Sequence, residues 1–319
     1  RTGGEADAIA VRIGRAASGR STVAFCGYHG WTDWYLSANL EDDDNLEGHL
    51  LPGLSPLGVP DHLRGSSIPF RYNSTQQLED IVENNSVGVV VMEVMRNVPP
   101  EPGFLERVRD LTKRKGIVLI FDECTSGFRE EFGGLHKKYG VNPDIAVFGK
   151  ALGNGYACTA ITGSREVMEV AQSTFISSTF WTERIGSVAA LATLKVMEET
   201  RSWEIVSSVG QQIKDGWKTL GKEHDLPLTV TGISSLPVLS FSSNLSREYK
   251  TLITQEMLKN NILSGDLICV CTEHQSDVVD QYLTALRDVF SLIEQCHNGR
   301  DVYELLESPV CHDKFYRLN

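Results

Sequence analysis

The chain has 319 residues, 41% of them apolar and 23% charged, and a formal net charge of -12. This composition is typical of a globular protein with a large core, and the length predicts two domains. The negative charge and the lack of a strongly basic stretch argue against nucleic acid as a partner, because phosphate binders need clustered lysine and arginine. The longest apolar runs, residues 87–92 and 117–121, are far too short to cross a bilayer, so we expect no membrane span.

The first predicted element is a helix that starts at Glu5 and stops at Gly19, because apolar residues recur between them at helical spacing. Residues 22–26 predict a short apolar strand, and residues 27–31, rich in aromatic residues and glycine, predict a loop of the kind that touches ligands. Residues 40–69 contain an aspartate run and many glycines and prolines. That segment predicts an exposed, irregular excursion, either a lid or a surface loop.

Strands and helices alternate beyond this excursion. The predicted helices are residues 75–84, 103–115 and 183–199, and the predicted strands are residues 87–92, 117–121, 144–148 and 158–162. The alternation predicts an α/β domain with a largely parallel sheet over residues 1–222. Residues 223–319 predict a smaller C-terminal α+β domain, with paired strands within 228–241 and helices over 247–260 and 277–296.

The seven cysteines are odd in number and lie mostly in apolar contexts. This pattern favours reduced core thiols over a disulfide framework, and it predicts a cytoplasmic protein. Cys269 and Cys271 are separated by one residue and lack both CxxC spacing and a matching second pair. We therefore expect them to be buried cysteines of a strand, and we predict no metal site.

Four predicted strands end at residues that can carry chemistry. They are followed by Tyr28 and His29, by Glu93, by Asp122 and by Lys150. Ligands of open α/β sheets bind outside the carboxyl ends of the strands, so we expect one pocket to contain all of these side chains. Each acid has an alternative as a cap of the next helix, and His29 or Glu93 taken alone indicates a structural role at least as readily.

Lys150 and Asp122 together predict a pyridoxal phosphate site. Lys150 follows a buried strand on a glycine-bounded turn, and we expect desolvation there to make its amine a nucleophile toward carbonyls. The cofactor needs an amine for its aldehyde and a carboxylate that keeps its pyridine nitrogen protonated. A P-loop is excluded at the same lysine, because Ala151 follows it where serine or threonine is needed.

The segment Thr2-Gly-Gly-Glu-Ala6 opens the first predicted helix and is a candidate phosphate site. Glycines leave the backbone N–H groups accessible, and the helix dipole favours an anion there. Tyr28 lies at a strand end, where it either stacks on a flat ring or belongs to the core. A GxGxxG fingerprint of dinucleotide binding is missing.

Taken together, these residues resemble the class III pyridoxal-phosphate-dependent aminotransferases of fold type I, most closely the branch similar to glutamate-1-semialdehyde aminomutase. Thr2-Gly-Gly-Glu-Ala6 is similar to the family's Ser-Gly-Thr-Glu-Ala phosphate turn, and Tyr28-His-Gly30 is similar to its ring-stacking motif. Phe121-Asp-Glu-Cys-Thr-Ser-Gly-Phe-Arg129 resembles its Asp-Glu-Val segment, and Phe148-Gly-Lys-Ala-Leu-Gly-Asn-Gly155 resembles its lysine motif. The resemblance covers nearly the whole chain and implies a mostly parallel central sheet with flanking helices.

The resemblance also implies a role for individual residues. Lys150 would form the internal aldimine and Asp122 would pair with the pyridine nitrogen, which makes these two the catalytic residues. Cys124 would pack on the ring face opposite Tyr28, and Thr179 would reach the phosphate bound in the partner subunit of a homodimer. The implied cofactor-binding residues are Gly3, Gly4, Tyr28, His29, Asn97, Asp122, Cys124, Lys150 and Thr179.

Several positions depart from the family pattern without removing a catalytic group. Gly4 stands where a hydroxyl residue is common, Cys124 where valine is usual, and Val94 where proline is usual. Trp181-Thr-Glu-Arg184 replaces a Gly-Asn-Pro segment. The sequence also opens without an initiating methionine and without the segment that precedes the family's phosphate turn, so we expect it to be part of a longer chain.

The resemblance implies amino-group transfer between an amine or amino acid and a carbonyl acceptor, with ping-pong kinetics and small-molecule substrates. One alternative is an aminomutase, which would use the same groups to move an amine between neighbouring carbons of one amino-aldehyde. A second alternative is an inactive homologue that only binds the cofactor. The presence of both Lys150 and Asp122 argues against this second alternative.

Overall fold

The computed structural model describes residues 1–49 and 52–312, and the chain divides into two compact units. Residues Arg1–Thr200 belong to the first unit, and the second begins at Arg201. The sequence places the boundary after residue 222, at the other end of helix α8 (Ser202–Glu223). In the structure α8 contacts elements of the second unit and belongs with it.

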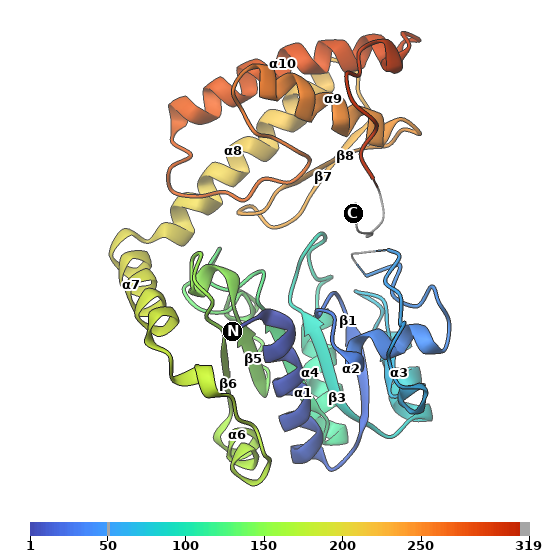
Figure 1. The fold of residues 1–319 in the computed structure, drawn as a ribbon, viewed down its shortest axis with the longest axis vertical. Coiled ribbons are helices and arrows are strands. Elements are labelled where there is room, and N and C mark those ends of the chain that lie inside the picture. Colours follow the sequence, from blue (N-terminus) through green and yellow to red (C-terminus); the bar gives the residue numbers. More distant parts are fainter. Residues whose placement is uncertain (50–51, 313–319) are drawn as a thin grey trace. The chain divides into compact units, whose positions relative to one another are not determined.

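The first unit is built on a six-stranded sheet (Figure 1). Its strands are β1 (Thr22–Cys26), β2 (Ser67–Pro69), β3 (Val87–Glu93), β4 (Val118–Glu123), β5 (Ile145–Phe148) and β6 (Ala160–Gly163). They lie in the order β2-β1-β3-β4-β5-β6, and neighbouring strands are parallel except for the antiparallel pair of β5 and β6. The prediction of an α/β unit with a mostly parallel sheet is confirmed.

Helices cover both faces of this sheet, which is why its central strands are continuous apolar runs. Helix α1 (Gly3–Ser18), dark blue in Figure 1, packs on β3, β4 and β5, and Val89 and Val118 lie in the core beneath it. Side chains alternate along a strand, so Val90 of β3 and its register partner Leu119 of β4 point to the opposite face. On that side α3 (Thr75–Asn84) contacts β1, and α4 (Phe104–Lys115) contacts β4.

The ends of α1 follow from its sequence. The hydroxyl of Thr2 accepts a hydrogen bond from the N–H of Glu5, which caps the start, and Gly19 ends the helix in a left-handed conformation with φ of 67°. A Cβ added to Gly14 would lie 3.0 Å from Val89, so glycine lets the helix approach the sheet closely. A Cβ on Gly3 would lie 3.3 Å from Sγ of Cys124, just beyond β4. The start of α1 therefore lies at the edge where the parallel strands end.

Short helical elements fill the connections of the first unit, and longer helices build the second. The remaining elements of the first unit are α2 (Asp33–Leu36), η1 (Ser37–Leu40), η2 (Asp61–Leu63), α5 (His136–Tyr139), η3 (Lys150–Leu152), α6 (Arg165–Glu169), η4 (Val170–Ser173), η5 (Thr179–Thr182) and α7 (Arg184–Thr200).

Within residues 1–49 and 52–312, none of the helices combines the length and apolar composition needed to cross a membrane.

The described part of the excursion predicted over residues 40–69 has more regular structure than expected, and residues 50 and 51 of it lie outside the described residues. It contains the turn η2 and the edge strand β2, and Leu46 within it is buried. The side chain of Asn39 accepts a hydrogen bond from the N–H of Leu46 and donates another to the carbonyl of Leu54. A three-residue strand is too short to show a period in the sequence, and its proline is tolerated because β2 lies at the sheet edge.

The second unit packs helices on a two-stranded antiparallel sheet. It contains α8, β7 (Leu228–Thr231), β8 (Val238–Phe241), α9 (Ser246–Lys259), α10 (Ser276–His297) and η6 (Val302–Glu304). Trp217 is fully buried at its centre, and its Nε1 donates a hydrogen bond of 2.8 Å to the hydroxyl of Tyr282. The predicted α+β character is observed, and α8 is a helix that the sequence reasoning did not identify.

The cysteine prediction is wrong for Cys269 and Cys271, which are exposed and lie outside any strand. Between them Val270 is buried, and its N–H donates to the carbonyl of Ser235 at 3.1 Å. In an extended segment neighbouring side chains point in opposite directions, so burial of Val270 turns both thiols outward. All seven cysteines are free.

Candidate active site

The carboxyl ends of the parallel strands carry the charged residues singled out in the sequence. Glu93 and Asp122 are register partners across β3 and β4. His29 follows β1 on the neighbouring side, and Lys150 follows β5 on the other. These four residues therefore lie at one edge of the sheet.

Asp122 and His29 form a buried pair at this edge. Oδ2 of Asp122 lies 2.9 Å from Nδ1 of His29, and its Oδ1 accepts a hydrogen bond of 2.9 Å from the N–H of Cys124. Nε2 of His29 lies 3.1 Å from the carbonyl of Cys26. Because a carbonyl only accepts, Nε2 carries a hydrogen, and the contact between Nδ1 and Oδ2 must hold a further proton.

The surroundings of Asp122 favour its ionised form. Burial by itself raises the pKa of this carboxyl, but the hydrogen bond and charge of His29, together with the N–H of Cys124, outweigh burial. The pKa of Asp122 consequently lies below its ordinary value of 3.8. A buried negative charge is thus held at the end of β4.

Lys150 is exposed, so the expectation that its strand would desolvate it is wrong. β5 already ends at Phe148, and the chain turns at Gly149 into η3. Lys150 itself has φ of 42°, a left-handed conformation that is uncommon outside glycine and costs free energy. Its Nζ donates a hydrogen bond of 3.0 Å to Oγ1 of Thr125, which fixes the amine beside the end of β4.

Glu93 is buried and paired with Arg96. Its Oε1 accepts a hydrogen bond of 2.8 Å from Nε of Arg96, and its Oε2 lies 3.4 Å from the N–H of Tyr28. Burial raises the pKa of Glu93 more than the charge of Arg96 lowers it. A Cβ on Gly27 would lie 2.7 Å from the same carboxylate, so glycine is required for the loop to pass over Glu93.

The first turn of α1 and the loop after β1 meet at two glycines. Gly30 has φ of 96°, and a Cβ on it would lie 2.7 Å from Cα of Gly4. The N–H groups of Gly3 and Gly4 have no hydrogen-bond partner in the part of the chain that the structure describes. Free N–H groups at the positive end of a 16-residue helix form a site for an anion.

Tyr28 and Cys124 border the same region. Tyr28 is half-buried and meets Tyr35 edge-on, with ring centroids 5.9 Å apart. Cys124 is buried between the positions of Gly3 and Gly149, where an added Cβ would lie 3.3 Å and 3.2 Å from its sulfur. Burial raises the pKa of this thiol, and the charge of Asp122 raises it further, so the sulfur keeps its proton.

A cavity of about 590 Å³ opens beside Glu93. Its wall includes Arg96, the exposed Asn97, and His49, whose Nδ1 accepts a hydrogen bond from the N–H of Gly27. Burial lowers the pKa of His49 to about 4, so this imidazole is neutral. Asn97 shares this cavity with Glu93, and among the described residues no hydrogen bond joins its side chain to Asp122 or Lys150.

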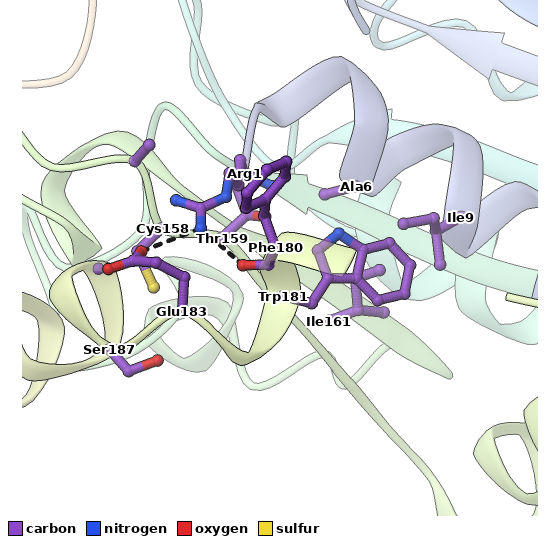
Figure 2. A pocket seen from close by; sticks show the side chains of 12 residues that line it. Arg1, Ala6, Ile9, Cys158, Thr159, Ile161, Phe180, Trp181, Glu183 and Ser187 are labelled. Carbon is purple, nitrogen blue, oxygen red and sulfur yellow. Dashed lines mark hydrogen bonds and ion pairs between the residues drawn. The ribbon is translucent and has the colours of Figure 1, made fainter. Parts of the chain in front are cut away.

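Thr179 is exposed on η5, and within the described residues no hydrogen bond joins its side chain to the cluster. Its segment is tied to the start of the chain, where Figure 2 shows the guanidinium of Arg1 reaching Phe180 and Glu183. The guanidinium donates to the carbonyl of Phe180 at 2.6 Å and to the Glu183 carboxylate at 2.9 Å. These residues line a cavity of about 230 Å³, separate from the one beside Glu93.

Three residues of the cluster were not assigned from the sequence: Asp7, Arg96 and Thr125. Asp7 lies on the buried face of α1, and an oxygen of its carboxyl lies within 4.8 Å of Asp122. The sequence did contain a signal for Asp7, because this acid lies at helical spacing from the small residues Ala10 and Gly14, on the face of the helix that is buried. Thr125 carried no comparable pattern, because its partners Arg96 and Lys150 follow other strands.

A family model described as aminotransferase class-III matches residues 1–285. A 3-aminobutyryl-CoA aminotransferase of Cloacimonas acidaminovorans (strain Evry) is 31% identical over 309 residues, covering 92% of this chain and 70% of that protein. A glutamate-1-semialdehyde 2,1-aminomutase of Desulfosudis oleivorans is 29% identical over 315 residues, covering 91% of this chain and 73% of that protein. Both similarities extend over both units of the chain.

Solved structures share this fold. One is the PLP internal aldimine form of the FumI protein of Sphingopyxis sp. MTA144, which superposes with a TM-score of 0.82 at 22% identity. The match covers 95% of this chain and 72% of that one.

Proposed function

This chain belongs to the class-III aminotransferase family, and we propose from that premise that Lys150 and Asp122 carry its chemistry. The chain is a pyridoxal-phosphate-dependent enzyme. Its proposed reaction passes an amino group from an amine or amino acid to a carbonyl acceptor in two half-reactions. The observation that carries the residue assignment is the buried, ionised Asp122 at one strand end beside the amine of Lys150 at the next.

The expected family, fold class, enzyme class and cofactor are confirmed by these similarities. The alternative of an inactive homologue is set aside with them. The aminomutase alternative stays open, because one of the similar proteins carries that name.

The residues at the strand ends fit the cofactor. The free N–H groups of Gly3 and Gly4 suit its phosphate, and the ionised carboxylate of Asp122 suits a protonated pyridine nitrogen. Tyr28 and Cys124 border the space between them and would flank the ring. When bound, pyridoxal phosphate supplies an aldehyde for an amine and a protonated ring that accepts electron density from the substrate.

Within this proposal the protein moves protons and keeps charges in place. Nζ of Lys150 is the base that takes the α-proton of the substrate and the acid that returns it. Oγ1 of Thr125 holds that amine beside β4. Asp122 stabilises positive charge on the ring nitrogen, and His29 keeps Asp122 ionised.

The decisive experiment adds pyridoxal phosphate to the purified protein and follows its visible absorbance before and after borohydride treatment. We expect a yellow protein in which borohydride fixes the cofactor on Lys150, as located by peptide mass spectrometry. Lys150→Ala is the control and should acquire neither the absorbance nor the label. A label on an exposed lysine elsewhere, such as Lys137, would contradict the assignment of Lys150.

Transaminase and aminomutase are separated by the need for an acceptor. A transaminase converts an amino donor only when a distinct keto acid or aldehyde is supplied. An aminomutase isomerises a single amino-aldehyde without one. We expect turnover of donor and acceptor pairs with ping-pong kinetics, and acceptor-independent isomerisation would favour the aminomutase instead.

We also propose that the enzyme is a homodimer in which Thr179 reaches the phosphate bound in the partner. Support comes from α7 and the segment before it, which expose Phe175, Ile185, Val188 and Leu191. Exposed large apolar side chains gathered on one segment are typical of an interaction surface. Leu191→Glu should shift the mass measured by light scattering from dimer to monomer, whereas exposed Lys195→Glu on the same helix serves as the control.

The proposed location is the cytoplasm. Its support is the seven free cysteines, which suit a reducing compartment. Fractionation of cells that express the natural full-length protein tests this, and recovery in a secreted fraction would contradict it.

A further inference from the structure

Asp7 lies on the face of α1 that packs against the sheet, where an acid is out of place. Its neighbours at helical spacing, Ala10 and Val11, are buried apolar residues, and Asp7 is itself only 2% exposed. Its Oδ1 has no hydrogen-bond partner among the described residues. A buried carboxyl group with an unpartnered oxygen costs free energy of folding, so a neighbouring group is expected to compensate it.

The neighbour is the acid of the proposed site. An oxygen of Asp7, an oxygen of Asp122 and Sγ of Cys124 all lie within 4.8 Å of one another. From the other strands packed under α1, Glu93 adds negative charge and Lys150 adds positive charge. His29, which follows β1, is the existing partner of Asp122, because its Nδ1 contacts Oδ2 of that carboxylate.

Two ionised carboxylates are unfavourable in this buried space. Removal from water raises the pKa of Asp7, and the charge of Asp122 and a hydrogen bond between the two carboxyl groups raise it further, well above 3.8. Burial also raises the pKa of Asp122, but His29 and the N–H of Cys124 outweigh it. The favoured arrangement has one proton on the pair, and that proton is on Asp7.

We infer that Asp7 keeps its proton at neutral pH and donates a hydrogen bond to the carboxylate of Asp122, which makes Asp7 a positioning residue for the carboxylate that holds the ring nitrogen. A carboxylate offers about four lone-pair positions. On Asp122 the N–H of Cys124 and the ring of His29 use two of them, Asp7 uses a third, and one is left for the cofactor. The catalytic meaning of this hydrogen bond rests on the proposed function, whereas the proton itself belongs to the protein without cofactor.

A divalent cation is the competing occupant of this cluster. Its ligands would be Asp7, Asp122 and Cys124. Only a thiolate is a strong ligand, and burial raises the pKa of the Cys124 thiol so that its sulfur stays protonated. The geometry and the protonated thiol therefore favour a shared proton over a metal ion.

The first experiment measures the free energy of unfolding of the cofactor-free protein between about pH 5 and about pH 7. The folded pKa of Asp7 lies above its unfolded value, so its contribution to stability is complete below pH 3.8 and is lost as the pH rises toward the folded pKa. In this window unfolding releases a proton from Asp7 in the parent and none from Asp7→Asn. We expect the stability of the parent to fall with pH more steeply than that of Asp7→Asn, by a slope of about one proton.

The exposed Asp43 supplies the matched control. The side chain of Asp43 lies in solvent, away from the pair of Asp7 and Asp122, so Asp43→Asn should keep the slope of the parent. Equal slopes for the parent and Asp7→Asn would mean that Asp7 is ionised in the folded protein, which overturns the inference.

A second measurement needs no variant to fold. The infrared spectrum of the cofactor-free parent at neutral pH should contain the C=O stretch of a protonated carboxylic acid, and labelling the aspartates with 13C should shift that band. Absence of a shifted band overturns the inference. A rise in the Tm of the parent on addition of Zn²⁺, missing in Asp7→Asn, would overturn it in favour of the cation.

The link to the cofactor is tested by comparing two substitutions. The amide of Asp7→Asn still donates to Asp122, whereas Asp7→Leu cannot. We expect the Kd for pyridoxal phosphate to be roughly tenfold higher in Asp7→Leu than in Asp7→Asn, and equal values would remove the positioning role. If the parent binds no pyridoxal phosphate, the proposed function fails, while the slope and the infrared band still decide where the proton is.

Discussion

Nζ of Lys150 donates a hydrogen bond of 3.0 Å to Oγ1 of Thr125. Lys150 follows β5 and Thr125 follows β4, so this bond ties two neighbouring strand ends together. The same hydroxyl accepts a second hydrogen bond of 3.0 Å from Nη2 of Arg96, which is paired with Glu93 at the end of β3. Three strand ends are therefore linked through a single hydroxyl, and the amine of Lys150 is held by that link.

Thr125→Val should release Lys150 without changing the size of the side chain at this position. One hydrogen bond is worth about 1 kcal/mol, so we expect kcat to fall roughly fivefold with little change in the Kd for pyridoxal phosphate. Steady-state kinetics and an absorbance titration measure the two quantities. Thr125→Ser keeps the hydroxyl and should behave as the parent, and a kcat unchanged in Thr125→Val would refute the role of the hydrogen bond.

His29→Phe should leave a buried carboxylate without its charged partner. Loss of one partner of a buried pair costs about 3–5 kcal/mol, so we expect a loss of that size in the free energy of unfolding near neutral pH. The pKa of Asp122 is below its ordinary value in the folded parent. The stability that Asp122 contributes is therefore present above pH 3.8 and lost as the pH falls through its folded pKa.

The difference between the parent and His29→Phe should consequently shrink in acid. Urea unfolding of the cofactor-free proteins at several pH values between about pH 7 and about pH 2, which extends well below the ordinary pKa of an aspartate, measures it. A difference that stays constant over this range would show that His29 acts through packing on its aromatic neighbours rather than through Asp122.

The sequence predicted those parts of the fold and site that depend on local pattern. The strands around Glu93 and Asp122 are continuous apolar runs, and each ends at a charged residue, so the shared edge of the sheet could be predicted. The helix from Gly3 to Ser18 was predictable from its period and from the glycine that stops it.

The remainder depends on contacts between distant segments. The strand Ser67–Pro69 exists only because β1 pairs with it, and three residues carry no period. Exposure of Lys150 follows from a strand that ends two residues earlier, at Phe148. The pairing of Asp7 with Asp122 needs the close approach of α1 to the sheet at Gly14, which no local pattern specifies.

Gly30→Ala should disturb the junction between the loop after β1 and the first turn of α1, which frame the candidate phosphate site. The new Cβ would lie 2.7 Å from Cα of Gly4, a backbone atom that cannot turn away. We expect a loss of about 2–4 kcal/mol in stability and a weaker affinity for pyridoxal phosphate, measured by thermal unfolding and by absorbance.

Gly19→Ala is the control, because Gly19 also has positive φ but has nothing within 4 Å of the added Cβ. It should cost only about 1–2 kcal/mol and leave cofactor affinity unchanged, and equal effects of both variants would contradict the contact with Gly4.

Glu123→Gln should separate structural from functional acids at the end of β4. Glu123 is fully buried next to Asp122, but it points away from the cluster and accepts hydrogen bonds from the N–H and Nδ1 of His136, at 2.9 Å and 2.8 Å. The oxygen of an amide can still accept from His136, but its NH2 group replaces Oε2, which accepts a hydrogen bond from the hydroxyl of Ser126. The buried hydroxyl of Ser126 therefore loses its acceptor, at a cost of about 1–3 kcal/mol. We expect a lower Tm for Glu123→Gln with undiminished labelling of Lys150 by borohydride.

Asp122→Asn should show the reverse, with labelling or affinity for pyridoxal phosphate lost first. If Glu123→Gln lost the cofactor as Asp122→Asn does, the assignment of catalysis to Asp122 alone would be wrong.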